Sequence, residues 1–245
     1  RIVSQATGED RLNLETDRPE LDHQDWAERV LGIHRARPAF TDPVIRGLAD
    51  RFPGMRPFSN GDLFEGIVTA IVGQSVSVQA AAVTERKLAE LFAEPITVGG
   101  RSYWPSPTRH QLANSEPEIV RRSGVTQRRA DAIVRIARMM TENQSLLSSV
   151  DRCDEQELIQ SLVNLPQVGR WTAESVLLWG LGVDDAYPIR DVALLRAARL
   201  GYDQPEMTHG DMDHLSDDWR PGRSWAARLL WLNLFGPAPL SRAPD

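Results

Sequence analysis

The chain has 245 residues, of which 41% are hydrophobic and 25% charged, a balance typical of one or two globular domains. No apolar run approaches the ~18 residues of a membrane span and no signal peptide opens the chain, so we expect no membrane association. The net charge of −6 argues against a protein that binds nucleic acids non-specifically over its whole surface. The single cysteine, Cys153, excludes an internal disulfide and a four-cysteine metal site, and it favours a reducing, cytoplasmic compartment.

The first residues differ in pattern from the rest. Residues 1–21 are polar with a brief alternation at Leu12 and Leu14, which indicates a segment of short strands. From residue 22 to residue 245 the apolar spacing is helical, and 94–107, with its glycines and prolines, is the clearest loop. The predicted helices lie within 22–33, 41–52, 61–74, 75–92, 107–115, 116–123, 126–140, 154–164, 170–181, 189–200 and 222–235.

Charge is unevenly distributed along the chain. Residues 121–138 contain six arginines and one acid, whereas 203–218 contain six acids and no arginine or lysine. A local basic face could meet phosphates, and the alternative is a solvated helix face balanced by an acidic one.

A tight turn separates two helical runs in the segment 158–181. The turn reads Leu165-Pro166-Gln167-Val168-Gly169, and its backbone N–H groups, together with the start of the following helix, suit a phosphate. Thr172 can add a hydroxyl or a cap. A plain corner between two helices is the alternative interpretation.

Asp191 follows this turn by 22 residues and stands at the start of an apolar and arginine-rich helix. An aspartate in this position is ordinarily an N-cap. The cap and a catalytic carboxylate are therefore both open interpretations at this point.

Several ordered motifs together resemble one family. They are "FEGIVTAIVGQSVSVQAAA", "WPSPTRHQLA", "GVTQRRADAIVRIA", "LPQVGRWTA", "PIRDVALLRA" and "WRPGRSWAARLLW". In this order they resemble the helix-hairpin-helix-GPD superfamily of DNA glycosylases, with the 3-methyladenine DNA glycosylase II (alkylbase glycosylase) branch as the nearest match. The resemblance runs from about residue 60 to 236 and implies a mainly helical fold of two subdomains with a DNA cleft between them.

The resemblance also implies an activity. Such an enzyme flips a damaged nucleotide out of duplex DNA and hydrolyses its glycosidic bond. It assigns Asp191 as the catalytic carboxylate, which supports an oxocarbenium-like sugar or activates water, and Trp171 and Trp231 as the base pocket, where an aromatic face attracts a cationic base. The implied DNA-binding residues are Gln74, Ser75, Gln167, Val168, Gly169, Arg170 and Thr172.

The chain departs from the family pattern at four positions. Gln167 replaces the first hairpin glycine, and Ser75 stands where an apolar wedge is usual. Ser175 and Val192 replace further aromatic walls, so we expect a more open pocket. For Trp104, Trp179, Trp219 and Trp225 we expect core packing.

Chemistry beyond hydrolysis is not expected. Family members that cut the strand use a lysine near the hairpin, but Trp171 stands there and Lys87 is the only lysine. The missing cysteine quartet separates the chain from the endonuclease III branch.

No catalytic metal or other cofactor is required, although the resemblance allows a monovalent cation, Na⁺ or K⁺, at the hairpin carbonyls near Val168. The motif "HGDMDH" at 209–214 could hold a divalent metal, and the alternative is a capped acidic helix start.

The sequence thus predicts a monofunctional glycosylase that excises alkylated purines of the 3-methyladenine and 7-methylguanine type. Its expected partner is damaged double-stranded DNA, and we expect a monomer that acts at the bacterial nucleoid. The rivals are a non-catalytic lesion- or DNA-binding protein that retains the fold, and a helical interaction module without DNA affinity. Relatives often carry a β-rich domain before the helices, which is either truncated or reduced here.

Overall fold

The computed structural model of the chain describes residues 2–5, 12–15, 23–33, 35–98, 100–143 and 154–236. Cys153 lies outside these residues. Within the described part no helix is long and apolar enough to cross a membrane.

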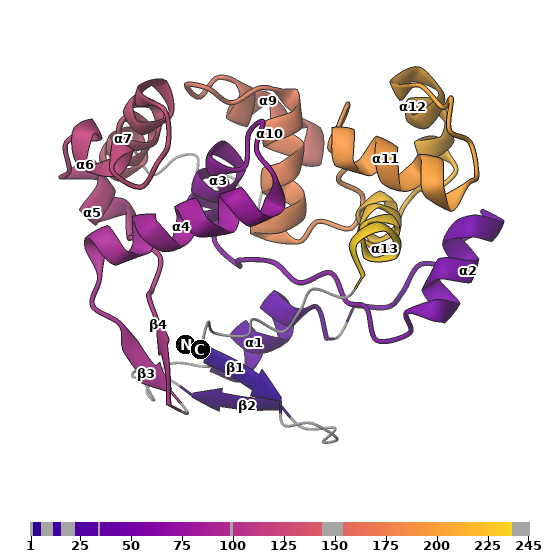
Figure 1. The fold of residues 1–245 in the computed structure, drawn as a ribbon, viewed down its shortest axis with the longest axis horizontal. Helices are drawn as coiled ribbons and strands as arrows, with labels where there is room; N and C mark the ends of the chain where they lie inside the picture. The colour runs from indigo at the N-terminus through magenta and orange to yellow at the C-terminus, as the bar shows by residue number, and fades with distance from the viewer. Residues whose placement is uncertain are drawn as a thin grey trace.

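Helices dominate the described residues (Figure 1). In chain order the elements are β1 (Ile2–Gln5), β2 (Leu12–Glu15), α1 (His23–Leu31), α2 (Pro43–Arg51), α3 (Leu63–Val72), α4 (Val78–Phe92), β3 (Ile96–Val98), β4 (Arg101–Tyr103), α5 (Arg109–Ala113), α6 (Pro117–Arg121), α7 (Gln127–Glu142), α9 (Glu155–Val163), α10 (Arg170–Ser175), the π-helical segment η1 (Val176–Leu181), α11 (Val192–Gly201), α12 (His209–Asp217) and α13 (Arg223–Phe235).

The helices form two groups, as the sequence predicts. In one group α3 packs against α4, α7, α10 and η1, and α5 and α6 pack against α7. In the other, α13 packs against α2 and α11, and α12 packs against α11. Figure 1 shows the second group, in orange, yellow and indigo, beside the first.

Side-chain caps explain why many of these helices begin where they do. Asp42 accepts a hydrogen bond from the backbone N–H of Ile45 at the start of α2, and Pro43 occupies the first helical position. Ser77 caps α4 and Thr126 caps α7 in the same way. The predicted and observed bounds therefore agree within a few residues.

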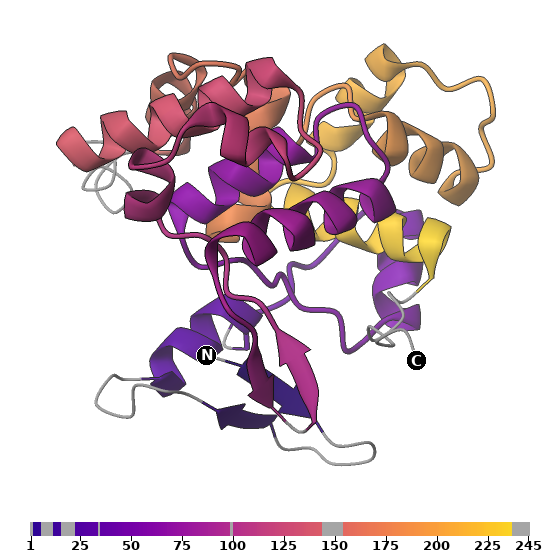
Figure 2. The same cartoon turned by 60° about the vertical axis from the view of Figure 1, so that its left-hand side comes forward.

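Two antiparallel hairpins, β1–β2 and β3–β4, lie at one end of the molecule (Figures 1 and 2). The first confirms the expected short strands before the helical region. The second corrects the sequence analysis, because segment 94–107 was expected to be a loop and contains paired strands, with Ile96 opposite Tyr103. Gly100, with φ of +78°, supplies the left-handed residue of the turn between them.

Helix α3 is almost wholly buried because it crosses η1 at very close range. A Cβ atom built on Gly66 would lie only 2.5 Å from the Cα atom of Gly180. Two glycines at the crossing therefore allow the backbones to approach, and they fix the helical hairpin against the central helix. Ile67 and Ile71 of the same helix are fully buried in the core.

Candidate functional site

The predicted hairpin is present, formed by α9, a turn at residues 164–169, and α10 continued by η1. Leu165 and Val168 are buried and turn the chain inward, with the N–H of Val168 donating to the carbonyl of Leu165 at 3.2 Å. Gly169 is the N-cap residue of α10 and offers no capping side chain, so the first amides of the helix lack a side-chain acceptor. These amides are the groups that a phosphate oxygen would bind.

Gln167 adopts the left-handed conformation, with φ of +61°. A glycine takes this conformation without strain, whereas a residue with a Cβ atom is held there at a cost of about 1–2 kcal/mol. The turn thus has a glycine-like conformation although a glutamine occupies the position. A Cβ atom on Gly169 would meet nothing within 4 Å, so the turn is open on this side.

A hydrogen-bonded tie joins the hairpin to the turn after α3. The side-chain amide of Gln74 donates to the carbonyl oxygen of Gln167 at 2.8 Å and to Oγ1 of Thr172 at 3.0 Å. Arg129 of α7 donates to the carbonyl of Gln74 from the other side. The two segments predicted to bind DNA therefore form one connected surface.

Ser75 stands at the tip of the turn after α3, exposed and left-handed with φ of +55°. Its short polar side chain offers little to fill a gap in a base stack. Two apolar neighbours are exposed beside it, Val76 at 43% and Val78 at 66%. The apolar surface of this turn therefore lies one to three residues beyond the position that the resemblance indicates.

Asp191 is the N-cap of α11, and its second carboxylate oxygen has a partner of its own. One carboxylate oxygen, Oδ1, accepts the backbone N–H of Leu194 at 2.6 Å and so caps α11. The other, Oδ2, accepts the indole N–H of Trp171 at 2.8 Å. The cap places the carboxylate at the positive end of the helix dipole, and Trp171 connects it to the hairpin.

The segment that leads to Asp191 is fixed by the N-terminus of α13. Ser224 donates from its hydroxyl to the carbonyls of Val183 and Ala186, and Arg223 pairs with Asp185 at 2.9 Å. The residue immediately before Asp191, Arg190, is left-handed with φ of +59°. Residues in this conformation often cluster at functional sites, where the surrounding structure holds them.

Arg170, which the resemblance implies in DNA binding, forms an ion pair with Glu174 of its own helix. Its guanidinium donates twice to the same oxygen of buried Glu174, at 2.8 and 2.9 Å, while Tyr187 N–H donates to the other oxygen at 3.1 Å. The ion pair offsets the positive charge that a phosphate would meet. Because the Arg170 side chain is still 44% exposed, it remains accessible at the start of the hairpin helix.

Trp231 belongs to an aromatic stack rather than to the Asp191–Trp171 pair. Its ring stacks on that of Trp179, with centroids 5.5 Å apart and planes 23° apart, and Phe58 lies 5.6 Å from Trp179. Among the hydrogen bonds and ring contacts of the described residues, none links Trp231 to Trp171 or Asp191. The predicted site residues other than Trp231 thus lie on the hairpin, on the turn after α3 and at the start of α11, whereas Trp231 lies on α13 against Trp179.

Trp179 was expected to pack in the core, and this holds only in part. Trp219 and Trp225 are fully buried, whereas Trp179 and Trp104 are half-buried. Trp179 lies eight residues after Trp171 and four after Ser175, a spacing that returns to one helix face. The spacing was readable from the sequence, but its stacking on Trp231 depends on tertiary packing.

Arg228 of α13 also contacts Trp179, and its role could not be predicted from the sequence. Its guanidinium is 4.1 Å from the Trp179 ring centroid and 4.8 Å from that of Phe58. It donates to the carbonyls of Phe58 and Leu178, while its Nε and Nη1 have no partner. Burial, and secondarily the charge of Arg35, lowers the pKa of Arg228 to about 9, so the side chain is a cation at neutral pH.

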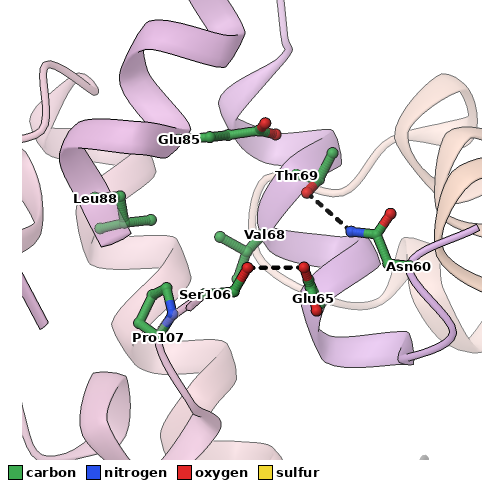
Figure 3. A pocket seen from close by; sticks show the side chains of 8 residues that line it. All are labelled: Asn60, Glu65, Val68, Thr69, Glu85, Leu88, Ser106 and Pro107. Atoms are coloured by element: carbon green, nitrogen blue, oxygen red, sulfur yellow. Dashed lines mark hydrogen bonds between the residues drawn. The ribbon is translucent and has the colours of Figure 1, made fainter. Parts of the chain in front are cut away.

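A polar cavity of about 160 Å³ lies apart from these residues, between α3, α4 and the segment before α5 (Figure 3). Glu65 accepts from the hydroxyl of Ser106 at 2.7 Å, and Glu85 faces the same space. Burial raises the pKa of both carboxyls, and the charge of Glu65 adds to the rise for Glu85. None of the predicted site residues lines this cavity.

The motif at 209–214 is a helix start, as the alternative interpretation held. Thr208 and Asp211 form a reciprocal capping box at the beginning of α12. The hydrogen bonds from Thr208 lower the pKa of Asp211. No group of three or more histidine, cysteine or acidic side chains is placed to hold a metal ion within the described ranges.

Comparisons with known proteins agree with the fold. No family model matches the chain. It is 26% identical over 198 residues to a DNA-3-methyladenine glycosylase of Bacillus subtilis, covering 80% of this chain and 65% of that protein. It is 33% identical, over the same share of this chain but 38% of the other, to a probable bifunctional transcriptional activator/DNA repair enzyme AlkA of Mycobacterium tuberculosis. The solved structure of a 3-methyladenine DNA glycosylase from Archaeoglobus fulgidus matches with a TM-score of 0.74 at 26% identity, over 92% of this chain and 77% of that one.

The architecture and these similarities point to one class of protein. In fold and in sequence the chain is similar to the DNA glycosylases of the helix-hairpin-helix-GPD superfamily, and among these to 3-methyladenine DNA glycosylases. It spans about two thirds or less of the two curated relatives named above.

Proposed function

We propose that this protein is a DNA glycosylase that releases alkylated purines from duplex DNA by hydrolysis of the N-glycosidic bond. The observation that carries the proposal is the Asp191 carboxylate, held by the N-terminus of α11 through one oxygen and by Trp171 of the hairpin through the other. A carboxylate that is hydrogen-bonded to the hairpin moves with the hairpin. Binding of the DNA backbone by the hairpin would therefore set the distance from the carboxylate to the sugar.

The two hydrogen bonds favour electrostatic support as the main role of Asp191. Bond breakage leaves positive charge on the sugar, and a fixed carboxylate beside it stabilises that charge without having to reorganise. Each carboxylate oxygen can accept about two hydrogen bonds, so room remains for one water. That water would attack C1′ and lose its proton to Asp191 or to solvent.

The aromatic residues support alkylated purines as the substrate class. A base such as 3-methyladenine or 7-methylguanine carries positive charge in DNA, and an indole face attracts a cation by ~0.5–2 kcal/mol. Trp171 and Trp231 are half-buried and thus retain ring surface that solvent can reach. The positive charge also weakens the glycosidic bond, so the base needs little acid assistance to leave.

Backbone amides of the hairpin and the connected turn support the binding of double-stranded DNA. Gly169 leaves the amides at the start of α10 uncapped, and Gln74 holds the turn at Ser75 against them. These contacts would fix the register of the DNA without reading its sequence. We expect the protein to bind damaged duplex as a monomer.

We further propose that the enzyme lacks strand-cleaving lyase activity. Lys87 is the only lysine in the sequence, and it lies exposed on α4 rather than on the hairpin. Without an amine beside the sugar, no Schiff base can form. Borohydride trapping during base release checks this: we expect no covalent protein–DNA adduct, and an adduct would refute the assignment.

The monovalent cation at the hairpin stays a prediction. Carbonyl oxygens are suitable ligands for Na⁺ or K⁺, but Leu165 O already accepts from Val168 and Gln167 O from Gln74. Replacing K⁺ by tetramethylammonium at constant ionic strength tests it, since a bound cation predicts weaker DNA binding in the bulky ion.

Base release from duplexes that each carry one defined lesion tests the proposed function. We expect release of 3-methyladenine and 7-methylguanine, with undamaged guanine retained. The rival, a lesion-binding protein without chemistry, predicts salt-sensitive DNA binding and no free base. A helical interaction module predicts neither.

A further inference from the structure

Arg228 stands out in the described part of the molecule as a buried cation without a dedicated counter-ion. The neighbouring charges, Arg35 and Asp184, pair with each other at 3.0 Å and so largely cancel. The guanidinium makes two hydrogen bonds to carbonyls, and two of its nitrogens have none. Burying an ion in this way is costly, and a side chain needed only for packing would be apolar.

The cation is aligned with the aromatic stack. Arg228 and Trp231 are three residues apart on α13, so they share a helix face, and the ring of Trp179 contacts both. The Arg228 guanidinium lies 4.1 Å from the ring centroid of Trp179, and the ring centroids of Trp179 and Trp231 lie 5.5 Å apart. The cation is therefore within about 10 Å of the Trp231 ring, which is half-buried and keeps some exposed surface.

From this geometry we infer that the positive charge of Arg228 helps the excised base to leave. Arg228 acts through the stacked rings of Trp179 and Trp231, as an electrostatic positioning residue. The inference rests on the proposed function and takes the flipped base to lie against the exposed surface of Trp231. It adds that the pocket holds a fixed positive charge beside its aromatic wall, on the order of 10 Å from the base.

The charge balance of the reaction explains the effect. When the bond between C1′ and the base nitrogen breaks, its electron pair goes to the base and the sugar becomes an oxocarbenium ion, which water then captures with loss of a proton. A cationic alkylpurine leaves as a neutral base, and a neutral purine such as hypoxanthine leaves as an anion that takes a proton from solvent. In both cases the base becomes one unit more negative, so a nearby cation favours its departure.

The same cation has opposite effects on binding and on chemistry for a cationic lesion. It repels the charged base before cleavage, and this repulsion disappears as the base leaves. A neutral base experiences no such penalty on binding. Arg228 therefore weakens the recognition of cationic lesions while it accelerates the release of both kinds, a split that a purely structural role cannot produce.

The test compares Arg228→Gln and Arg228→Met, which remove the charge at every pH, with Arg228→Lys, whose ammonium keeps the charge only at low pH because burial lowers the pKa of a lysine as it lowers that of Arg228. Near-UV circular dichroism and a cooperative thermal transition establish that each variant is folded. Single-turnover release is measured at saturating enzyme on duplexes with 7-methylguanine or hypoxanthine. Lesion affinity, relative to undamaged duplex, is measured by fluorescence anisotropy in the Asp191→Asn background, where the base stays in place.

We expect the neutral variants to slow release from both duplexes by roughly three- to tenfold, as a unit charge at this distance predicts. In the same variants the relative affinity for 7-methylguanine duplex rises by a similar factor, and that for hypoxanthine duplex is unchanged. Arg228→Lys should resemble the parent at acidic pH and approach the neutral variants as the pH rises and its ammonium loses a proton. Parallel losses of rate and affinity, or no change in either, would overturn the inference. If neither neutral variant folds, Arg228→Lys decides, because a rate that does not fall relative to the parent as the pH rises contradicts a role that depends on charge.

Wild-type protein separates this inference from the proposed function. If wild-type protein releases neither base, the glycosylase proposal itself fails and takes the inference with it. If it releases them and the variants show no split between binding and rate, only the role of Arg228 is refuted.

Discussion

The indole N–H of Trp171 donates to Oδ2 of Asp191 at 2.8 Å, joining the second helix of the hairpin to the carboxylate that caps α11. This one bond connects the element that would grip the DNA backbone to the group that would face the sugar. The cap supplies orientation along the helix axis, and Trp171 fixes the remaining rotation of the carboxyl group.

Trp171→Phe removes the donor and keeps an aromatic ring. We expect single-turnover base release to slow by about tenfold or more, since a hydrogen bond to a charged group is worth ~1.5–3 kcal/mol. Affinity for damaged duplex should change by less than about threefold. Trp104→Phe, at a half-buried tryptophan that is not among the predicted site residues, is the matched control. An equal loss of affinity and rate would instead indicate that Trp171 acts only as a pocket wall.

The hydrogen bonds of Gln74 connect the turn after α3 to the hairpin. Their removal is therefore expected to weaken DNA binding whether or not the duplex carries a lesion. Gln74→Leu removes the hydrogen bonds to Gln167 and Thr172, and we expect affinity to fall by about tenfold for damaged and undamaged duplex alike. Gln79→Leu, at an exposed position of α4, should leave affinity unchanged. A loss confined to damaged duplex would contradict this account.

The exposed valines after Ser75 predict where the base stack is wedged. We expect the double variant Val76→Ser, Val78→Ser to weaken the distortion of lesion-bearing duplex, because apolar side chains are what enters a base step. Fluorescence of 2-aminopurine beside the lesion reports this distortion. Ser75→Ala should leave the signal near that of wild type. A loss of the signal in Ser75→Ala but not in the double variant would show that Ser75 is the residue that enters the base stack.

The cavity shown in Figure 3 predicts a pH dependence of stability. Burial raises the pKa of Glu65 and Glu85, so the folded state keeps protons to a higher pH than the unfolded chain. Stability is therefore lost as pH rises from the ordinary carboxyl value near 4.5 through the raised folded-state value.

Glu85→Gln should accordingly raise the melting temperature at pH 8 and have little effect at pH 4. Differential scanning calorimetry across this range measures both effects. Glu118→Gln, at an exposed position of α6, is the control and should shift neither. A decrease in melting temperature at pH 8 would show that the Glu85 charge is stabilising instead.

Local features of the fold follow from the sequence because short-range chemistry sets them. Asp42, Thr126 and Asp191 each cap a helix whose start lies within a few residues of the predicted bound. The hairpin at 94–107 was missed although Gly100 and the β-branched residues before it are hairpin signals. Its proline content favoured a loop instead.

The site was only partly predictable because tertiary contacts decide it. The pairing of Asp191 with Trp171 agrees with the sites that the resemblance implies, but the hydrogen bond that joins them depends on how α10 and α11 meet. The Arg228–Trp179–Trp231 stack combines η1 with α13, some fifty residues later, and no local pattern reveals it. The π-helical course of η1, which packs closely on Gly66, likewise has no local sequence signal.

The most direct test of the central claim is single-turnover release of 7-methylguanine from a defined duplex by wild-type protein and by Asp191→Asn. The amide removes the negative charge while its oxygen can still accept a hydrogen bond, so the fold should persist. We predict that release falls by about a thousandfold or more while affinity for the duplex stays within about threefold of wild type. Release by the variant at a rate near that of wild type would contradict the account.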